Sequence, residues 1–423
     1  MSDRINHPAF ALALRIVAAG LSFVFGIVAA RLLGIEAFGV VSVLLGFANV
    51  GIVFALLGHE TLATREIAAM SRNADQRAAR AYSRSASRQV WLAGVVVLCV
   101  LLAAVAMLPI GEKAGPEFLA LLALVPLVAR TRLSQGLIRG AHLASLSLVP
   151  DGILRPGLAV LLLGALILAG QEAERGFVVV MLGCALLALL FGRIWERNAL
   201  ETPSVPEGRS AHESVPVRHF SMSIFVSSML AVLVSQIALI STGLLAEPAA
   251  AGLYAAAERF SLAAALVGQA VYLAVASRFA ALHASGDIAG LRALIRKVTR
   301  SVSAATLLLC VVLGVAAVPL LRLYGDAFVS AAPVLQVLLL SVLCNAGAGP
   351  TGQVLLMTRN ERDHLVAMVA SLVLQSVLIA LLVPTHGVIG VACAVLASTL
   401  VWNGLMMFFI RRRLAINPVL AFA

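Results

Sequence analysis

Long apolar segments dominate the sequence and most limit what the chain can fold into. A helix that crosses the hydrocarbon core of a bilayer needs about 20 mostly apolar residues. Twelve segments meet that requirement, at approximately residues 9–31, 38–57, 90–110, 117–137, 146–169, 176–195, 220–244, 249–276, 300–323, 332–355, 364–384 and 387–410. Of the 423 residues, 61% are hydrophobic and only 12% are charged, whereas about one quarter of a soluble domain is charged. The sequence therefore predicts an all-α polytopic membrane protein with about twelve transmembrane helices.

Lysine and arginine are unevenly distributed between the segments that connect these spans. With the N-terminus inside, the cytoplasmic segments hold 22 of the 31 basic residues and the outside segments hold four. This bias is typical of cytoplasmic loops, and the even number of spans places both termini in the cytoplasm. The net charge of +11 is then explained by topology, with anionic lipids and not nucleic acid as the expected partner.

The chain is expected to divide into two bundles of six spans each. The segment "ETPSVPEGRSAHESVPV" is rich in Pro, Ser and Glu and is typical of a linker. The expected domains are an N-terminal bundle at 1–195, a cytoplasmic linker at 196–219 and a C-terminal bundle at 220–423.

The two halves share a layout at an offset of 213 residues. Gly39 then aligns with Gly252, and Arg65 aligns with Arg278. Repeats of six spans have the same orientation, which predicts a pseudo-two-fold axis along the membrane normal and a central site between the bundles.

Two adjacent charges lie inside the apolar stretch "LYAAAERFSLAAALVGQ". Arg259 follows Pro248 by eleven residues, which places it about 16 Å into the membrane. Ionisable groups at that depth are costly and are candidates for function. Glu258 shares a helix face with Gln269, whereas Arg259 lies about 100° away. Both residues are candidates to line a polar cavity, and the alternative is an ion pair with another span.

Three further arginines are candidates for a cationic cavity. Arg15 either faces a cavity or extends to the cytoplasmic interface. Arg130 lies late in the fourth span. Asp151 and Arg155 have the i,i+4 spacing of a local ion pair, which would compete with contact to a substrate. The uncharged candidates, which would serve a cavity or interhelical hydrogen bonds, are Asn49, Ser235, Gln236 and Gln269.

No motif in the sequence indicates a cofactor, a metal site or catalysis. The five cysteines lie singly, without the spacing of a metal site or a disulfide framework. The sequence contains no Walker loop, no GxGxxG and no hydrolase elbow. We therefore expect no cofactor and no enzyme activity, and proton or sodium coupling stays open.

The order of these segments resembles that of polysaccharide flippases of the O-antigen and exopolysaccharide type. The stretch "AARLLGIEAFGVVSVLLGFANVGIVFALLGHETLATREIA" is similar to the opening of that family. In the second half, "GLYAAAERFSLAAALVGQ", "FVSAAPVLQVLLLSVLCNAGAGPTGQVLLMTRNERDHL" and "VPTHGVIGVACAVLAST" follow in the same order. The family belongs to the superfamily that also contains multidrug-and-toxin extrusion (MATE) transporters.

The resemblance implies a MATE-like transporter of the bacterial inner membrane. Its substrate would be an undecaprenyl-diphosphate-linked oligosaccharide, moved outward by alternating access, and other polysaccharide-assembly proteins would be its partners. Arg15, Arg155 and Arg259, with Arg130 as a weaker candidate, would form the cationic cavity. One alternative is a multidrug or cation antiporter, which needs carboxylates within the membrane. A second is a membrane-embedded glycan ligase or transferase, which the short outside loops disfavour.

Overall fold

The described part of the chain is helical. The computed structural model describes residues 8–72, 76–170, 173–201 and 222–414, and these ranges contain no strand. The chain divides into two compact units, one formed by Met1–Gly34 and Val40–Val232 and the other by Ile35–Gly39 and Leu233–Ala423. Most of the expected linker lies outside the described residues, so the expected domain boundaries stay predictions.

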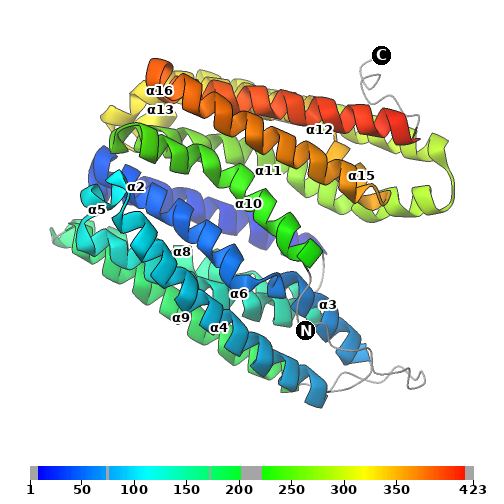
Figure 1. Cartoon of the computed structure of the whole chain (residues 1–423), viewed down its shortest axis with the longest axis horizontal. Coiled ribbons are helices and arrows are strands. Elements are labelled where there is room, and N and C mark those ends of the chain that lie inside the picture. The colour runs from blue at the N-terminus through cyan, green and yellow to red at the C-terminus, as the bar shows by residue number, and fades with distance from the viewer. Residues whose placement is uncertain (1–7, 73–75, 171–172, 202–221, 415–423) are drawn as a thin grey trace. The chain divides into compact units, whose positions relative to one another are not determined.

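The first unit is built from consecutive helices (Figure 1). They are α2 (Pro8–Leu56), α3 (His59–Arg72), α4 (Gln76–Ala106), α5 (Pro109–Leu119), η1 (Ala120–Ala123), α6 (Leu124–Gly140), α7 (Ala144–Ser147), η2 (Val149–Leu154), α8 (Arg155–Ala169) and α9 (Ala173–Glu201).

The second unit repeats this all-helical construction. Its elements are α10 (Met222–Leu245), α11 (Pro248–Ala284), α12 (Ile288–Val315), α13 (Ala317–Arg322), η3 (Asp326–Ala331), α14 (Ala332–Ala348), α15 (Thr351–Met357) and α16 (Glu361–Leu414). The border between the units falls inside α10.

Two helices are long enough for two membrane crossings each. Helix α2 has 49 residues and α16 has 54, so straight helices of these lengths would span about 74 and 81 Å, more than twice the hydrocarbon thickness of about 30 Å. Both are interrupted by a glycine with positive φ, at Gly34 (φ 76°) in α2 and Gly387 (φ 57°) in α16. Glycine adopts this conformation without steric penalty, and each kink therefore joins two crossings.

The predicted fold class is confirmed. Ten described helices are long and apolar enough to cross a membrane, and counting α2 and α16 as two crossings each gives the expected twelve. The all-α construction and the two six-helix bundles agree with the sequence, whereas the pseudo-two-fold axis stays a prediction.

The structure agrees with the expected fifth span and interrupts the tenth. The stretch "VPDGILRP" forms the π-helix η2 and leads directly into α8, so the fifth span continues through it. In the tenth span, by contrast, α14 ends at Ala348, Gly349 has φ 78°, and α15 begins at Thr351. Pro350 follows this glycine and has no amide proton to continue the helix.

The two glycines that the repeat aligns lie against each other in the second unit. A Cβ added at Gly39 would overlap the carbonyl oxygen of Pro248 and lie 2.9 Å from the amide nitrogen of Gly252. A Cβ added at Gly252 would overlap the carbonyl oxygen of Ile35. Next to this crossing, the ring of Phe38 packs 5.8 Å from that of Phe328. Only glycine permits the backbones of α2 and α11 to approach so closely.

Candidate functional site

The π-helix η2 sets the position of two of the predicted site residues. It carries Asp151 and ends just before Arg155, the first residue of α8. Pro150 and Pro156 both lack an amide proton, which prevents a regular α-helical hydrogen-bond ladder at both ends of this stretch. Short π-helical segments of this kind are frequent at functional sites.

Two arginines converge on the single carboxylate of Asp151. Its Oδ1 lies 3.0 Å from Nε of Arg155, and its Oδ2 lies 3.7 Å from Nε of Arg132 on α6. The expected i,i+4 pair is therefore formed, and a second cation joins it. The three side chains are partly accessible, at 27% for each arginine and 15% for the aspartate. This Arg132–Asp151–Arg155 cluster carries one excess positive charge.

Both arginines of the cluster keep donors for a second anion. Each meets Asp151 through Nε, and a guanidinium carries four further N–H donors on its two terminal nitrogens. Paired donors of this kind match the oxygens of phosphate groups. The cluster could therefore hold a phosphate while Asp151 compensates part of the positive charge.

Arg15 lies on the helix that packs beside η2. A Cβ at Gly152 would lie 3.4 Å from Cβ of Ala18 in α2, and a Cβ at Gly157 would lie 3.6 Å from the side chain of Leu21. Arg15 is exposed and precedes Ala18 by three residues, so it lies on the same side of α2, about one turn away. Arg15 and Arg155 therefore belong to one region of the first unit.

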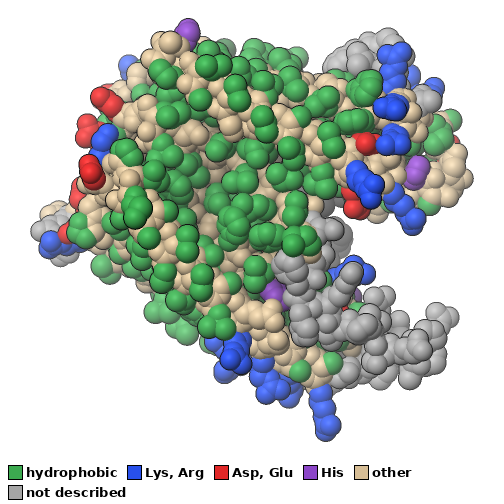
Figure 2. All heavy atoms as spheres, in the orientation of Figure 1, with side chains coloured by type: hydrophobic (Ala, Val, Ile, Leu, Met, Phe, Trp, Pro, Cys, Tyr) green, Lys and Arg blue, Asp and Glu red, His purple; other side chains and the backbone are tan. Residues whose placement is uncertain are grey.

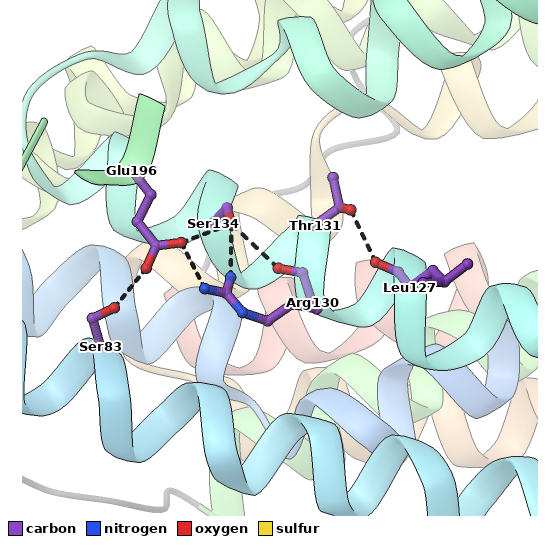
Figure 3. Close-up of polar contacts among 6 residues, drawn as sticks. All are labelled: Ser83, Leu127, Arg130, Thr131, Ser134 and Glu196. Carbon is purple, nitrogen blue, oxygen red and sulfur yellow. Dashed lines mark hydrogen bonds and ion pairs between the residues drawn. The ribbon is translucent and has the colours of Figure 1, made fainter. Parts of the chain in front are cut away.

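Arg130 has a different environment from the other predicted cations (Figure 3). Its side chain is 1% exposed, and its Nη2 lies 2.8 Å from Oε2 of Glu196 on α9. Ser134 accepts a hydrogen bond from Arg130 Nη1 at 2.7 Å and donates one to Glu196 at 2.8 Å. Ser83 on α4 donates to the other oxygen of Glu196 at 2.5 Å. This buried pair ties α4, α6 and α9 together and compensates the charge of Arg130 within the bundle, and a substrate-binding role for Arg130 stays a prediction.

The second unit holds the other two charged candidates. Glu258 and Arg259 are partly buried in α11, and Glu258 shares a side-chain hydrogen bond with Tyr254 one turn earlier. Gln269 is exposed farther along the same helix. That these groups share a cavity with the arginines of the first unit stays a prediction.

The uncharged candidates lie on three helices, α2, α10 and α11. Gln236 donates to the neighbouring Ser235 at 3.3 Å on α10, and Asn49 is half-buried on the second part of α2. Two residues of the charged clusters, Arg132 and Glu196, are absent from the sequence-based candidates. The one available signal was that each places a charge in or next to an apolar span.

Comparisons with known proteins show the family through one family model and the fold through solved structures. A family model described as "Polysaccharide biosynthesis protein" matches residues 9–279. None of the curated proteins matches the sequence. A multidrug resistance MATE family transporter of the MOP superfamily, in an inward-facing conformation, has a similar structure at a TM-score of 0.78 and 16% identity, with 96% of this chain and 98% of that chain covered.

Two further solved structures share the fold. A MOP superfamily transporter from Pyrococcus furiosus, described as having a binding pocket of reverse polarity that suggests a different function, is similar at a TM-score of 0.68 and 16% identity, over 96% of this chain and 95% of that chain. Lipid II flippase MurJ, in an inward closed conformation, is similar at a TM-score of 0.66 and 13% identity, over 94% and 87%.

Proposed function

Because the chain belongs to the family of polysaccharide biosynthesis proteins, we propose that it is a flippase for an undecaprenyl-diphosphate-linked oligosaccharide. The substrate would move from the cytoplasmic to the periplasmic leaflet of the bacterial inner membrane. The observation that carries this proposal is the Arg132–Asp151–Arg155 cluster, in which two guanidinium groups share one carboxylate. The fold shared with lipid II flippase MurJ supports it.

A cationic site addresses the main physical obstacle to flipping such a lipid. The diphosphate carries negative charge, and charge is costly inside a bilayer unless it meets protein or water. Two arginines can replace part of its hydration with charge-assisted hydrogen bonds. Asp151 balances one of the two positive charges while the site is empty, so the excess charge stays small.

We propose the following transport cycle for this arrangement. The headgroup and sugars would enter from the cytoplasm, bind at the arginines and leave on the opposite side by alternating access. The lipid tail would stay in the bilayer, and both termini would stay cytoplasmic. The proposed cycle uses no cofactor, and coupling to a proton or sodium gradient stays open.

The proposal is tested by depleting the protein in its host and measuring lipid-linked oligosaccharide on the cytoplasmic face of the membrane. We expect accumulation that the wild-type gene reverses. Arg132→Gln and Arg155→Gln should each lower the rate of flipping by about tenfold or more, because each removes a charged donor pair worth on the order of 1.5–3 kcal/mol. Arg322→Gln is the matched control. Arg322 also has an acidic neighbour at i,i+4, but its side chain is 64% exposed and its Nε lies as far as 4.0 Å from Oδ1 of Asp326, so the pair is weak.

The outcomes separate function from site. Unchanged lipid-linked oligosaccharide after depletion, without a redundant flippase, would refute the function. Full rescue by both arginine variants would refute only the site. Arg259→Ala tests the candidate cation of the second unit in the same way: full rescue by this variant would refute a role for Arg259 in substrate binding.

The antiporter alternative rests on Glu258, a partly buried carboxylate inside a span. It predicts drug sensitivity after depletion, with no change in lipid-linked oligosaccharide. Wild type should then restore resistance, and Glu258→Gln should not, because the amide cannot exchange a proton. Asp151 is less suited to this role, because two arginines already compensate its charge.

A further inference from the structure

A row of arginines follows one face of α4. Arg77, Arg80, Arg84 and Arg88 are all exposed, and their spacing of three and four residues places them on one side of the helix. The row continues toward the apolar end of α4 as exposed aliphatic residues, Leu92 at 60%, Val96 at 61% and Val100 at 61%. One outward face thus changes from arginine to aliphatic side chains without a break. No Asp or Glu occurs between the first and last residues of α4.

Helix α9 shows the same change on its own outward face. Leu186, Leu190 and Ile194 are exposed aliphatic residues, and the exposed Arg193 and Arg197 lie near the C-terminal end of the helix. The only acidic residue between these two arginines is Glu196. Its carboxylate is buried and pairs with Arg130, so it does not neutralise the surface.

Two contacts fix how α4 and α9 run past each other. Ser83 of α4 donates to Glu196 of α9. At the opposite end, Arg175 near the start of α9 pairs with Glu117 of α5, the helix that follows α4. The two helices are therefore antiparallel, and Ser83 and Glu196 mark a common level.

From this level, four arginines fall into one layer. Arg84 and Arg88 lie about 1.5 and 7.5 Å from Ser83 toward the apolar end of α4. Arg193 lies about 4.5 Å in the same direction on α9, and Arg197 about 1.5 Å in the other. The layer is about 9 Å deep, close to the headgroup region on one side of a bilayer, which is about 5–8 Å. Figure 2 shows Lys and Arg side chains at the end of the first unit where Figure 1 places the start of α4.

We propose that Arg84, Arg88, Arg193 and Arg197, the arginine belt, bind the phosphate headgroups of anionic phospholipids in the leaflet on that side. Among the described residues, none of the four forms an ion pair, so their donors are open to a ligand. The acyl chains of a bound lipid would lie along the exposed aliphatic residues of α4 and α9. This site is separate from the Arg132–Asp151–Arg155 cluster and does not depend on the proposed transport function.

The position of each arginine sets its expected contribution. Arg77 and Arg80 lie about 9 and 4.5 Å beyond the level of Ser83, away from the membrane. Electrostatic attraction to the surface weakens within a Debye length of about 8 Å. Arg84 and Arg88 should therefore contribute more to lipid binding than Arg77 and Arg80. A soluble acidic partner would give the opposite order, because it would reach the outermost arginines first.

Native mass spectrometry of the full-length protein in detergent tests the proposal, with phosphatidylglycerol and phosphatidylcholine of matched acyl chains as probes. We expect the wild type to bind phosphatidylglycerol at least about a hundredfold more tightly. Replacing all four belt arginines with Gln should remove this preference, since one arginine near a lipid surface contributes about fivefold. The matched control replaces four exposed basic residues of the second unit with Gln, namely Arg296, Lys297, Arg411 and Arg412, and should lower the preference less than the belt variant does.

Two milder variants keep the test decisive if the fourfold variant does not fold. Arg84→Gln with Arg88→Gln should weaken phosphatidylglycerol binding about tenfold or more. Arg77→Gln with Arg80→Gln should weaken it severalfold less. Retained preference in the folded belt variant, equal loss in the control, or a larger loss at Arg77 and Arg80 would each overturn the proposal.

Discussion

At the scale of single residues, the buried pair of Arg130 and Glu196 is expected to control the stability of the first unit. The side chain of Arg130 is 1% exposed, and Glu196→Ala leaves its guanidinium without a counter-charge. Breaking a buried ion pair in this way costs about 3–5 kcal/mol of unfolding free energy. We expect a clear drop in the melting temperature of the purified protein, measured by thermal unfolding in detergent.

A double substitution separates this charge effect from a loss of packing. Arg130→Met with Glu196→Met removes both charges, and should be more stable than Glu196→Met alone because no uncompensated charge remains. Asp363→Asn is the surface control, since it breaks a pair in which Arg413 is 55% exposed, and should cost less than about 1 kcal/mol. A single Glu196 variant as stable as the double variant would contradict the prediction.

The residues of the candidate site were only partly accessible to sequence reasoning. The i,i+4 spacing identified the Asp151–Arg155 pair, because contacts within one helix follow from its geometry. The third member, Arg132, and the partner of Arg130 both come from other helices. Their contacts depend on how the helices pack, and spacing along the chain does not contain that information.

At the scale of elements, the crossing of α2 and α11 is expected to tolerate no side chain. Gly39→Ala would drive a methyl group into the carbonyl of Pro248, and Gly252→Ala would do the same to the carbonyl of Ile35. Backbone atoms cannot turn away as a side chain can, and such overpacking costs about 1–3 kcal/mol or more. Both variants should show a lower melting temperature and a lower yield of folded protein.

Gly20→Ala in the same helix is the control for this prediction. No atom lies within 4 Å of a Cβ at Gly20, and replacing a helical glycine with alanine is favourable by about 0.5–1 kcal/mol. Gly20→Ala should therefore be neutral or slightly stabilising. If all three variants are equally stable, a methyl group fits at the crossing of α2 and α11, and the prediction is wrong.

The same glycines show how far the sequence determines the elements. The repeat offset aligned Gly39 with Gly252 from the order of segments alone, and the structure brings the two together. The helix break at Gly349 was not expected. The spans were identified from the average hydropathy over about 20 residues, and a single Gly-Pro pair hardly changes that average. Hydropathy therefore predicts that a segment crosses the membrane, and backbone conformation decides where the helix is interrupted.

At the scale of the whole molecule, the kinks at Gly34 and Gly387 decide between ten and twelve crossings. If each kink is an outside turn, Glu36 and His386, both exposed, lie on the periplasmic side, while Arg84 and Arg412 lie in the cytoplasm. In a variant without native cysteines, Glu36→Cys and His386→Cys should react with a membrane-impermeant maleimide in spheroplasts. Arg84→Cys and Arg412→Cys should react only after permeabilisation, because the positive-inside bias retains arginine-rich segments in the cytoplasm. Labelling of all four positions from one side would contradict twelve crossings and, with them, the parallel repeats from which the central site is predicted.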